Sequence, residues 1–214
     1  MKTFSIGGIV AALALAFGNA QAAVTTFTDE ASFLAAAGAG LTQEGFETAT
    51  QSTPTSVSFG GGTFSCSGSA WCPGFFGING GIAKEGSQSV FFASPDTATF
   101  TFNSPISAFG IFIGGAGDVA PITLSLTTSS GETVTALNNF TGPNVGDPGG
   151  FDPFIGLIKT DGFFTGVTFT PSNQDDGIFF DRMSYGTAAV PEPGTLALLG
   201  IAACGLGGLR RRKG

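Results

Sequence analysis

Acidic side chains carry most of the chemistry open to this sequence of 214 residues, because it contains no histidine. Without an imidazole there is no base for a Ser-His-Asp or Cys-His pair and no ligand for a His-based zinc site. Two kinds of carboxylate chemistry remain, the acid and base pair of a glycan hydrolase and the binding of a hard cation. The candidate residues are therefore acids in apolar or aromatic surroundings.

Asp181 is the most informative of these acids. It lies in an apolar segment where a strand would place it on the same face as Phe179, Met183 and Tyr185. A carboxylate on a buried face needs a cationic partner, since leaving the charge unpaired costs several kcal/mol. Asp181 is therefore expected to pair with Arg182 of a neighbouring strand, to lie at a sheet edge, or to bind a metal ion.

Aromatic side chains with a polar edge are scarce. The chain has one tryptophan and one tyrosine, Trp71 and Tyr185, whereas glycan hydrolases and lectins usually line their clefts with such rings. Trp71 has two open interpretations, a place in the core or a stacking surface for a sugar. A hydrolase would also need two carboxyl groups about 5 Å or about 6.5–9.5 Å apart, a separation that only the fold can set.

The first 22 residues have the pattern of a secretory signal peptide. Lys2 supplies a positive charge, residues 6–17 form an apolar run, and small residues occupy the cleavage positions in Ala20-Gln21-Ala22. We expect signal peptidase to cleave after Ala22, so that residues 23–214 are exported.

The last 25 residues, 190–214, form a second targeting segment. A Pro-Glu-Pro motif precedes an apolar stretch over residues 195–209, and a basic cluster follows. The motif is Pro191, Glu192 and Pro193, and the cluster is Arg210, Arg211, Arg212 and Lys213. The apolar stretch would rise about 22 Å as a helix, short of the roughly 30 Å hydrocarbon core, so it would cross a membrane only marginally. The basic cluster would stay in the cytoplasm and leave the domain outside.

This tail resembles the PEP-CTERM sorting signal of Gram-negative bacteria, in which the same three parts occur in the same order. The resemblance implies that an exosortase processes the protein near the motif, and that the C-terminal helix holds it in the inner membrane only transiently. The protein would then remain at the cell surface or in the extracellular matrix. The alternative is a permanent tail anchor without processing.

The remaining segment, 23–189, must carry the function. It has three basic and 14 acidic residues, a net charge of −11, so nucleic acid is not an expected partner. Its two cysteines, Cys66 and Cys72, are expected to form a disulfide in an oxidising compartment. Closing this small loop would stabilise the fold by about 2.4 kcal/mol and stiffen the segment that carries Trp71.

The pattern of residues 23–189 predicts an all-β domain with one short N-terminal helix. The helix is expected to begin at Thr28 as N-cap and to end at Gly38. Short segments in which apolar residues alternate with Thr and Ser predict strands, and their spacing favours an antiparallel sandwich. The expected strands are 55–59, 63–66, 89–92, 97–102, 106–113, 122–128, 133–137, 154–159, 163–170 and 178–185.

The domain also resembles the extracellular domains that precede PEP-CTERM tails. The matching segments are the expected helix, Glu44-Gly45-Phe46-Glu47, residues 105–110 and residues 176–186. The resemblance implies a jelly-roll-like β-sandwich similar to carbohydrate-binding modules. It also implies a structural calcium ion between an acid of the first strand, Glu44 or Glu47, and Asp181 of the last, with further oxygens from Asp175 and Asp176.

The function expected from the sequence is that of an exported, non-enzymatic surface or matrix protein associated with exopolysaccharide. A calcium-dependent carbohydrate-binding module, with Trp71 as the contact residue, is the alternative. A carboxylate-based glycan hydrolase is the third hypothesis.

Overall fold

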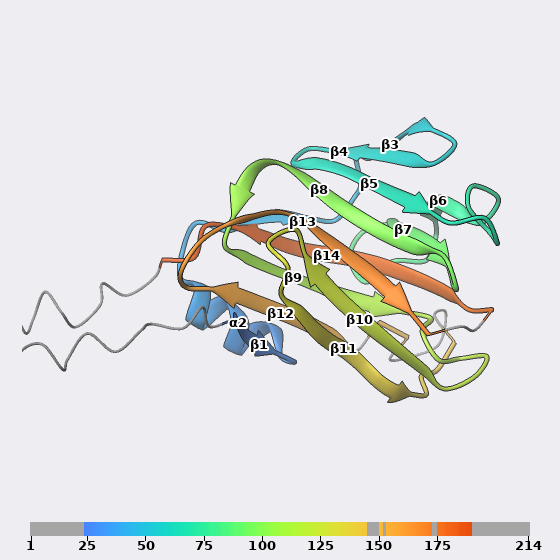
Figure 1. Cartoon of the computed structure of the whole chain (residues 1–214). Helices are drawn as coiled ribbons and strands as arrows, with labels where there is room; N and C mark the ends of the chain where they lie inside the picture. Colours follow the sequence, from blue (N-terminus) through green and yellow to red (C-terminus); the bar gives the residue numbers. More distant parts are fainter. Residues whose placement is uncertain (1–23, 145–149, 152, 173–174, 190–214) are drawn as a thin grey trace, which may run out of the picture.

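A computed structural model describes residues 24–144, 150–151, 153–172 and 175–189 (Figure 1). The expected signal peptide and the expected sorting segment, including the Pro-Glu-Pro motif and the arginine cluster, lie outside these described residues. Within the described part of the chain, no helix has the length and apolar character needed to cross a membrane.

Two antiparallel sheets form the domain. The first sheet has the order β1 (Val24–Phe27), β12 (Phe154–Lys159), β9 (Ala108–Gly114), β14 (Gly177–Gly186), β7 (Gln88–Ala93) and β6 (Phe76–Gly80), and β2 (Thr42–Glu44) pairs with β14. The second sheet has the order β11 (Thr133–Phe140), β10 (Ile122–Thr128), β13 (Phe164–Pro171), β8 (Thr97–Ile106), β5 (Gly62–Ser67), β4 (Ser56–Phe59) and β3 (Thr50–Thr53).

Phenylalanine rings from both sheets fill the space between them. The ring of Phe169 on β13 lies 4.5 Å from that of Phe180 on β14, and Phe100 on β8 lies 5.6 Å from Phe180 and 6.0 Å from Phe109 on β9. All four side chains are fully buried. Strands such as β10 alternate buried and partly exposed residues, as expected for strands with one face on this core. The expected antiparallel sandwich is therefore confirmed.

A second apolar cluster covers the outer face of the first sheet. Helix α2 (Glu30–Ala37) places the fully buried Phe33 against Phe154, with ring centroids 5.7 Å apart. The strands beneath carry Gly110 and Gly156, where an added Cβ would lie 2.8 and 2.7 Å from the Phe33 ring. Strand β9 is consequently buried on both faces, as its unbroken apolar sequence predicts.

The structure differs from the sequence-based expectation at the ends of elements. The helix N-cap is Asp29, not Thr28, because the Asp29 carboxylate accepts the N–H of Ser32 at 2.8 Å. Gly38 ends the helix as expected. The ten expected strands are found with small shifts, and the hairpin of β10 and β11 is formed. Four short strands were not expected: β1, β2, β3 and β6.

Strand β14 contains an irregularity that changes the surroundings of Asp181. Its pairing with β9 shifts register between Asp181 and Ser184, and Arg182 has a φ of +47°. Phe180 and Met183 both reach the core between the sheets, so the side-chain alternation is interrupted between them. Asp181 therefore lies on the outer face with Phe179, and the expectation that it shares a face with Met183 and Tyr185 is wrong.

Candidate functional site

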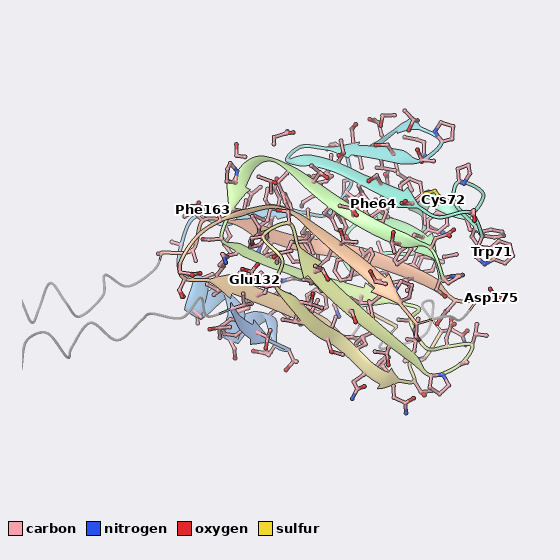
Figure 2. All side chains as sticks on the ribbon, viewed as in Figure 1. Phe64, Trp71, Cys72, Glu132, Phe163 and Asp175 are labelled. Atoms are coloured by element: carbon pink, nitrogen blue, oxygen red, sulfur yellow. A yellow bond between two sulfur atoms is a disulfide. The ribbon has the colours of Figure 1, made fainter. Side chains whose placement is uncertain are left out.

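Trp71 lies in the connection between β5 and β6 at one end of the sandwich. Its side chain is 36% exposed, so the interpretation as a core residue is wrong. Phe75 is 55% exposed, and its ring meets that of Trp71 edge to face with centroids 5.0 Å apart. Figure 2 shows Trp71 beside Asp175 at this end, and Phe163 at the opposite end.

Asp96, in the turn between β7 and β8, holds the Trp71 loop. Its Oδ2 accepts the N–H groups of Trp71 and Cys72, each at 2.6 Å, and its Oδ1 accepts the N–H of Ala70 at 3.2 Å. Burial opposes ionisation of this carboxyl, but the backbone donors outweigh it and hold the pKa of Asp96 below its usual range. At Gly68 an added Cβ would lie 1.8 Å from Asp96, so the loop can close over the carboxylate only with glycine there.

The expected disulfide is present and closes the same loop. Cys66 at the end of β5 is bonded to Cys72, with their Cα atoms 6.0 Å apart. Two restraints therefore act on Trp71, the covalent bond at Cys72 and the hydrogen bonds to Asp96.

An open hollow of about 280 Å³ lies beside Trp71. It is lined by Trp71, Phe75, Ala93, Asp175, Asp176 and Gly177. The indole Nε1–H of Trp71 donates to Asp175 Oδ1 at 3.2 Å, which fixes the orientation of the ring. Among the residues that the structure describes, the lining includes two carboxylates and no lysine or arginine, so the hollow favours neutral or cationic ligands over anionic ones.

Asp176 is buried at the edge of this hollow, with 2% of its surface exposed. Its Oδ2 accepts the N–H of Gly117 at 2.6 Å, whereas its Oδ1 has no hydrogen-bond donor among the described residues. Burial raises the pKa of Asp176 to about 7, the Gly117 N–H opposes the shift, and the neighbouring carboxyl of Asp118 adds to it.

A hollow of about 350 Å³ lies around Tyr185, Phe102 and Gly61. Its aromatic residues are almost covered, since Tyr185 is 9% and Phe102 5% exposed. This hollow therefore presents no ring face to a ligand, in contrast to the hollow at Trp71.

The carboxylates of Glu44, Glu47 and Asp181 each accept backbone N–H groups. Glu44 accepts the N–H of Phe46 at 2.8 Å. Glu47 accepts the N–H groups of Ser87 and Gln88, and these bonds with the Ser87 hydroxyl hold its pKa below the usual value. These carboxylates therefore act as acceptors for backbone groups that would otherwise lack a partner.

Asp181 is fully buried under the segment that joins β6 and β7. Its Oδ2 accepts the N–H groups of Lys84 and Glu85 at 2.6 and 2.8 Å, and its Oδ1 accepts the N–H of Arg182 at 2.7 Å. Burial raises the pKa of Asp181 to about 6 against these hydrogen bonds. The Arg182 guanidinium pairs with Glu30 at 2.9 Å, so the expected ion pair between Asp181 and Arg182 is not formed.

The five acids named as calcium ligands do not converge. Asp175 and Asp176 precede β14 beside Trp71, whereas Asp181 lies within β14 under the Lys84 turn. Among the residues that the structure describes, no three acidic, cysteine or histidine side chains gather as a metal site. The sequence-based reasoning missed Phe75, Asp96 and Asp118. Asp96 and Asp118 acquire their partners from connections distant in sequence, whereas Phe75 meets Trp71 within the same loop, whose conformation the sequence pattern does not give.

The described residues define an all-β sandwich domain with an aromatic hollow at one end. The chain also carries a PEP-CTERM protein-sorting motif, whose family model matches residues 189–213. This match confirms the resemblance drawn from the Pro-Glu-Pro motif and the basic cluster, and it marks an exported protein of the kind that exosortases process.

Several solved structures are similar in outline. The K1 cleaved adhesin domain of Lys-gingipain from Porphyromonas gingivalis W83 is 12% identical, with a TM-score of 0.43 over 70% of this chain and 99% of that chain. A xylan-binding domain from carbohydrate-binding module family 22 is 17% identical, with a TM-score of 0.41 over 72% and 98%. TmCBM61, solved with β-1,4-galactotriose, is 15% identical, with a TM-score of 0.36 over 66% and 92%. A comparison with curated proteins gives no match for this chain.

Proposed function

We propose that this protein is a non-enzymatic surface or matrix protein that binds extracellular polysaccharide at the Trp71 hollow. The observation that carries the proposal is the exposed pair of rings, Trp71 and Phe75, held beside the carboxylate of Asp175. A sugar presents an apolar face and hydroxyl groups, and this site offers an aromatic surface for the face and carboxylate oxygens for the hydroxyls.

The Trp71 loop is ordered before any ligand arrives, which supports this function. The disulfide, the three N–H bonds to Asp96 and the indole bond to Asp175 restrict the ring in the free protein. Because a rigid side chain loses little entropy on binding, a single indole can contribute more than a mobile one.

The carboxylates of the hollow support binding in preference to hydrolysis. Asp175 receives the indole N–H of Trp71, and Asp176 is buried with its Oδ2 on the N–H of Gly117. A glycosidase instead sets one acid and one base or nucleophile on either side of the scissile bond. Asp175 and Asp176 are adjacent in sequence, and each already accepts a hydrogen bond from the protein.

The sorting motif supports an extracellular location, and the net charge of the domain indicates which class of glycan it can bind. The PEP-CTERM motif at residues 189–213 accounts for delivery outside the cell, where exopolysaccharide is present. The net charge of −11 over residues 23–189 opposes binding of uronate-rich or other anionic polymers. Neutral or amino-sugar polysaccharides are therefore the proposed ligands.

Affinity electrophoresis of the exported protein through gels that contain xylan, galactan, glucan or the exopolysaccharide of the producing cells tests this function. We expect retardation by at least one neutral polymer, and a weakening of about tenfold or more in Trp71→Ala, which corresponds to about 1.4 kcal/mol. Phe163→Ala is the matched control, because Phe163 is 57% exposed and lies at the other end of the sandwich (Figure 2). Equal weakening in both variants, or none in Trp71→Ala, would contradict the proposed site.

A further inference from the structure

A pair of carboxylates, Asp118 and Asp176, lies behind the Trp71 hollow. Asp118 belongs to the connection that follows β9, and Asp176 directly precedes β14, so two connections at the same end of the sandwich bring the acids together. The N–H of Gly117, the residue before Asp118, donates to Asp176 Oδ2 at 2.6 Å, which places the two acids side by side, and the Asp118 carboxyl helps to raise the pKa of Asp176. Asp176 is 2% exposed and Asp118 is half-buried. Two carboxyl groups in such surroundings need either a positive charge near them or a proton on one of them.

The described residues do not supply that charge. Asp176 Oδ1 is buried and has no hydrogen-bond partner among them, while the carboxyl receives the backbone N–H groups of Gly117, at Oδ2, and of Gly177. The basic side chains of the domain make contacts elsewhere: Lys84 lies over the ring of Phe112, Lys159 pairs with Glu132, and Arg182 pairs with Glu30. The buried oxygen is thus an acceptor without a donor, in a carboxyl group that has a second acid beside it.

The turn that presents Asp118 is fixed by its backbone. Gly115 and Gly117 have φ values of +71° and +78°, and the N–H of Asp118 donates to the carbonyl of Gly115 at 3.4 Å. An added Cβ at Gly117 would lie 2.4 Å from the carbonyl oxygen of Phe140. The backbone position of Asp118 beside Asp176 is therefore fixed by the fold.

We propose that Asp118 and Asp176 bind a divalent cation between their carboxylates, with calcium the best match. Calcium takes six to eight oxygen ligands in flexible geometry, and backbone carbonyls and water would complete the set around two carboxylates. Zinc and copper favour imidazole and thiolate, but the chain has no histidine, and Cys66 and Cys72 form a disulfide. This ligand set shares only Asp176 with the set expected from the sequence.

The cation would tie the connection after β9 to the start of β14. Because Asp176 also lines the hollow, and Asp175 orients the indole of Trp71, an ion here would stiffen the hollow from behind. Extracellular calcium sites commonly have dissociation constants of about 10⁻⁴–10⁻³ M, which suits an exported protein. The inference stands independently of polysaccharide binding.

Thermal melting of the exported protein in EGTA and in about 5 mM CaCl₂ tests the site. For a dissociation constant near 0.5 mM, we expect calcium to raise the melting temperature by about 3–6 °C. The key variant is Asp118→Asn, whose amide can donate to Asp176 Oδ1. It should melt in EGTA at or above the wild-type temperature and should show no response to calcium. Asp161→Asn, which removes an acid paired with Lys159 at 3.4 Å, should keep the full response.

Isothermal titration of the chelated protein with CaCl₂ gives the second readout, with one saturable event expected in the wild type and in Asp161→Asn, and none in Asp118→Asn. An unchanged melting temperature of the wild type in calcium would overturn the proposal, as would equal calcium responses in the wild type and Asp118→Asn. Stabilisation by mild acid without any effect of calcium would show a shared proton at the pair and would overturn it as well.

Discussion

Asp96→Ala should loosen the Trp71 loop while leaving the sandwich folded. The substitution removes the acceptor of three backbone N–H groups, those of Ala70, Trp71 and Cys72. The substitution touches neither Trp71 nor its indole partner Asp175, so any loss of ligand binding must arise from the loop backbone.

The size of the effect follows from the hydrogen bonds. Bonds to a charged group contribute about 1.5–3 kcal/mol each, so three bonds set an upper limit of about 9 kcal/mol. Water reaches the freed N–H groups because the loop is exposed, and the Cys66–Cys72 bond still closes it. We therefore expect a loss of about 3 kcal/mol, or about 6–12 °C in melting temperature for a domain of this size.

Urea unfolding and affinity electrophoresis should be carried out on the same preparations. Asp96→Ala should weaken polysaccharide binding by about tenfold, because binding must then order the loop. Asp96→Asn keeps one acceptor oxygen and should lie between the wild type and Asp96→Ala. The control is Asp161→Ala, which removes a partly exposed ion pair with Lys159 and should cost less than about 1 kcal/mol. Wild-type stability and binding in Asp96→Ala would refute the account of how Trp71 is held.

The remaining predictions concern stability and processing. Burial opposes ionisation of Glu132, but Lys159, Ser130 and Thr128 lower its pKa from 4.5 to about 2, so its contribution is complete above pH 4.5 and is lost as the pH falls towards 2. Glu132→Gln should therefore cost about 1–3 kcal/mol at pH 7, and urea unfolding should show this difference disappearing between about pH 5 and pH 2. The double variant Cys66→Ser, Cys72→Ser should lower the free energy of unfolding by about 2 kcal/mol, and an unchanged value would exclude a stabilising role for the bond. The intact mass of the exported protein, measured by mass spectrometry, should match a chain that lacks Arg210 to Lys213. A mass that includes these residues would contradict exosortase processing.

Strands with one buried apolar face could be predicted from the sequence, and strands without such a face could not. In β10 the alternation of Ile122, Leu124 and Leu126 with Thr and Ser is sufficient to identify the strand. Strand β3 is exposed along its whole length, and β2 has three residues with none buried. Such strands form because their backbone groups hydrogen-bond to the free edge of a neighbouring strand. That edge exists only once the sheet is assembled.

The bulge in β14 shows where periodicity fails. A regular strand would put Asp181, Met183 and Tyr185 on one face, but the positive φ of Arg182 moves the last two to the other face. No residue type in this segment requires that conformation, since glycine is absent from residues 178–185. Asp181 is fully buried, but on the outer face with Phe179 and not on the face of Met183 and Tyr185, where the sequence pattern places it.

The sequence predicted only those contacts of the candidate site that join residues close in the chain. The disulfide and the loop of Trp71 follow from residues that are close in sequence, whereas Asp96 and Asp175 reach that loop from 25 and 104 residues away. Asp96 follows a proline, which is ordinary turn chemistry and gives no sign of three backbone donors. The hollow is lined by the connection between β5 and β6, the end of β7 and the start of β14, and these segments meet only in the fold.

Tryptophan fluorescence tests the central claim most directly, because Trp71 is the only tryptophan of the chain and its emission reports on the hollow alone. Titration of the exported protein with a polysaccharide that retards it in gels should shift the emission to shorter wavelength and saturate. The midpoint should match that of the gel assay and should move to higher polymer concentration in Asp96→Ala. Unchanged Trp71 emission while the polymer is bound would show that polysaccharide binds elsewhere and would contradict the proposed site.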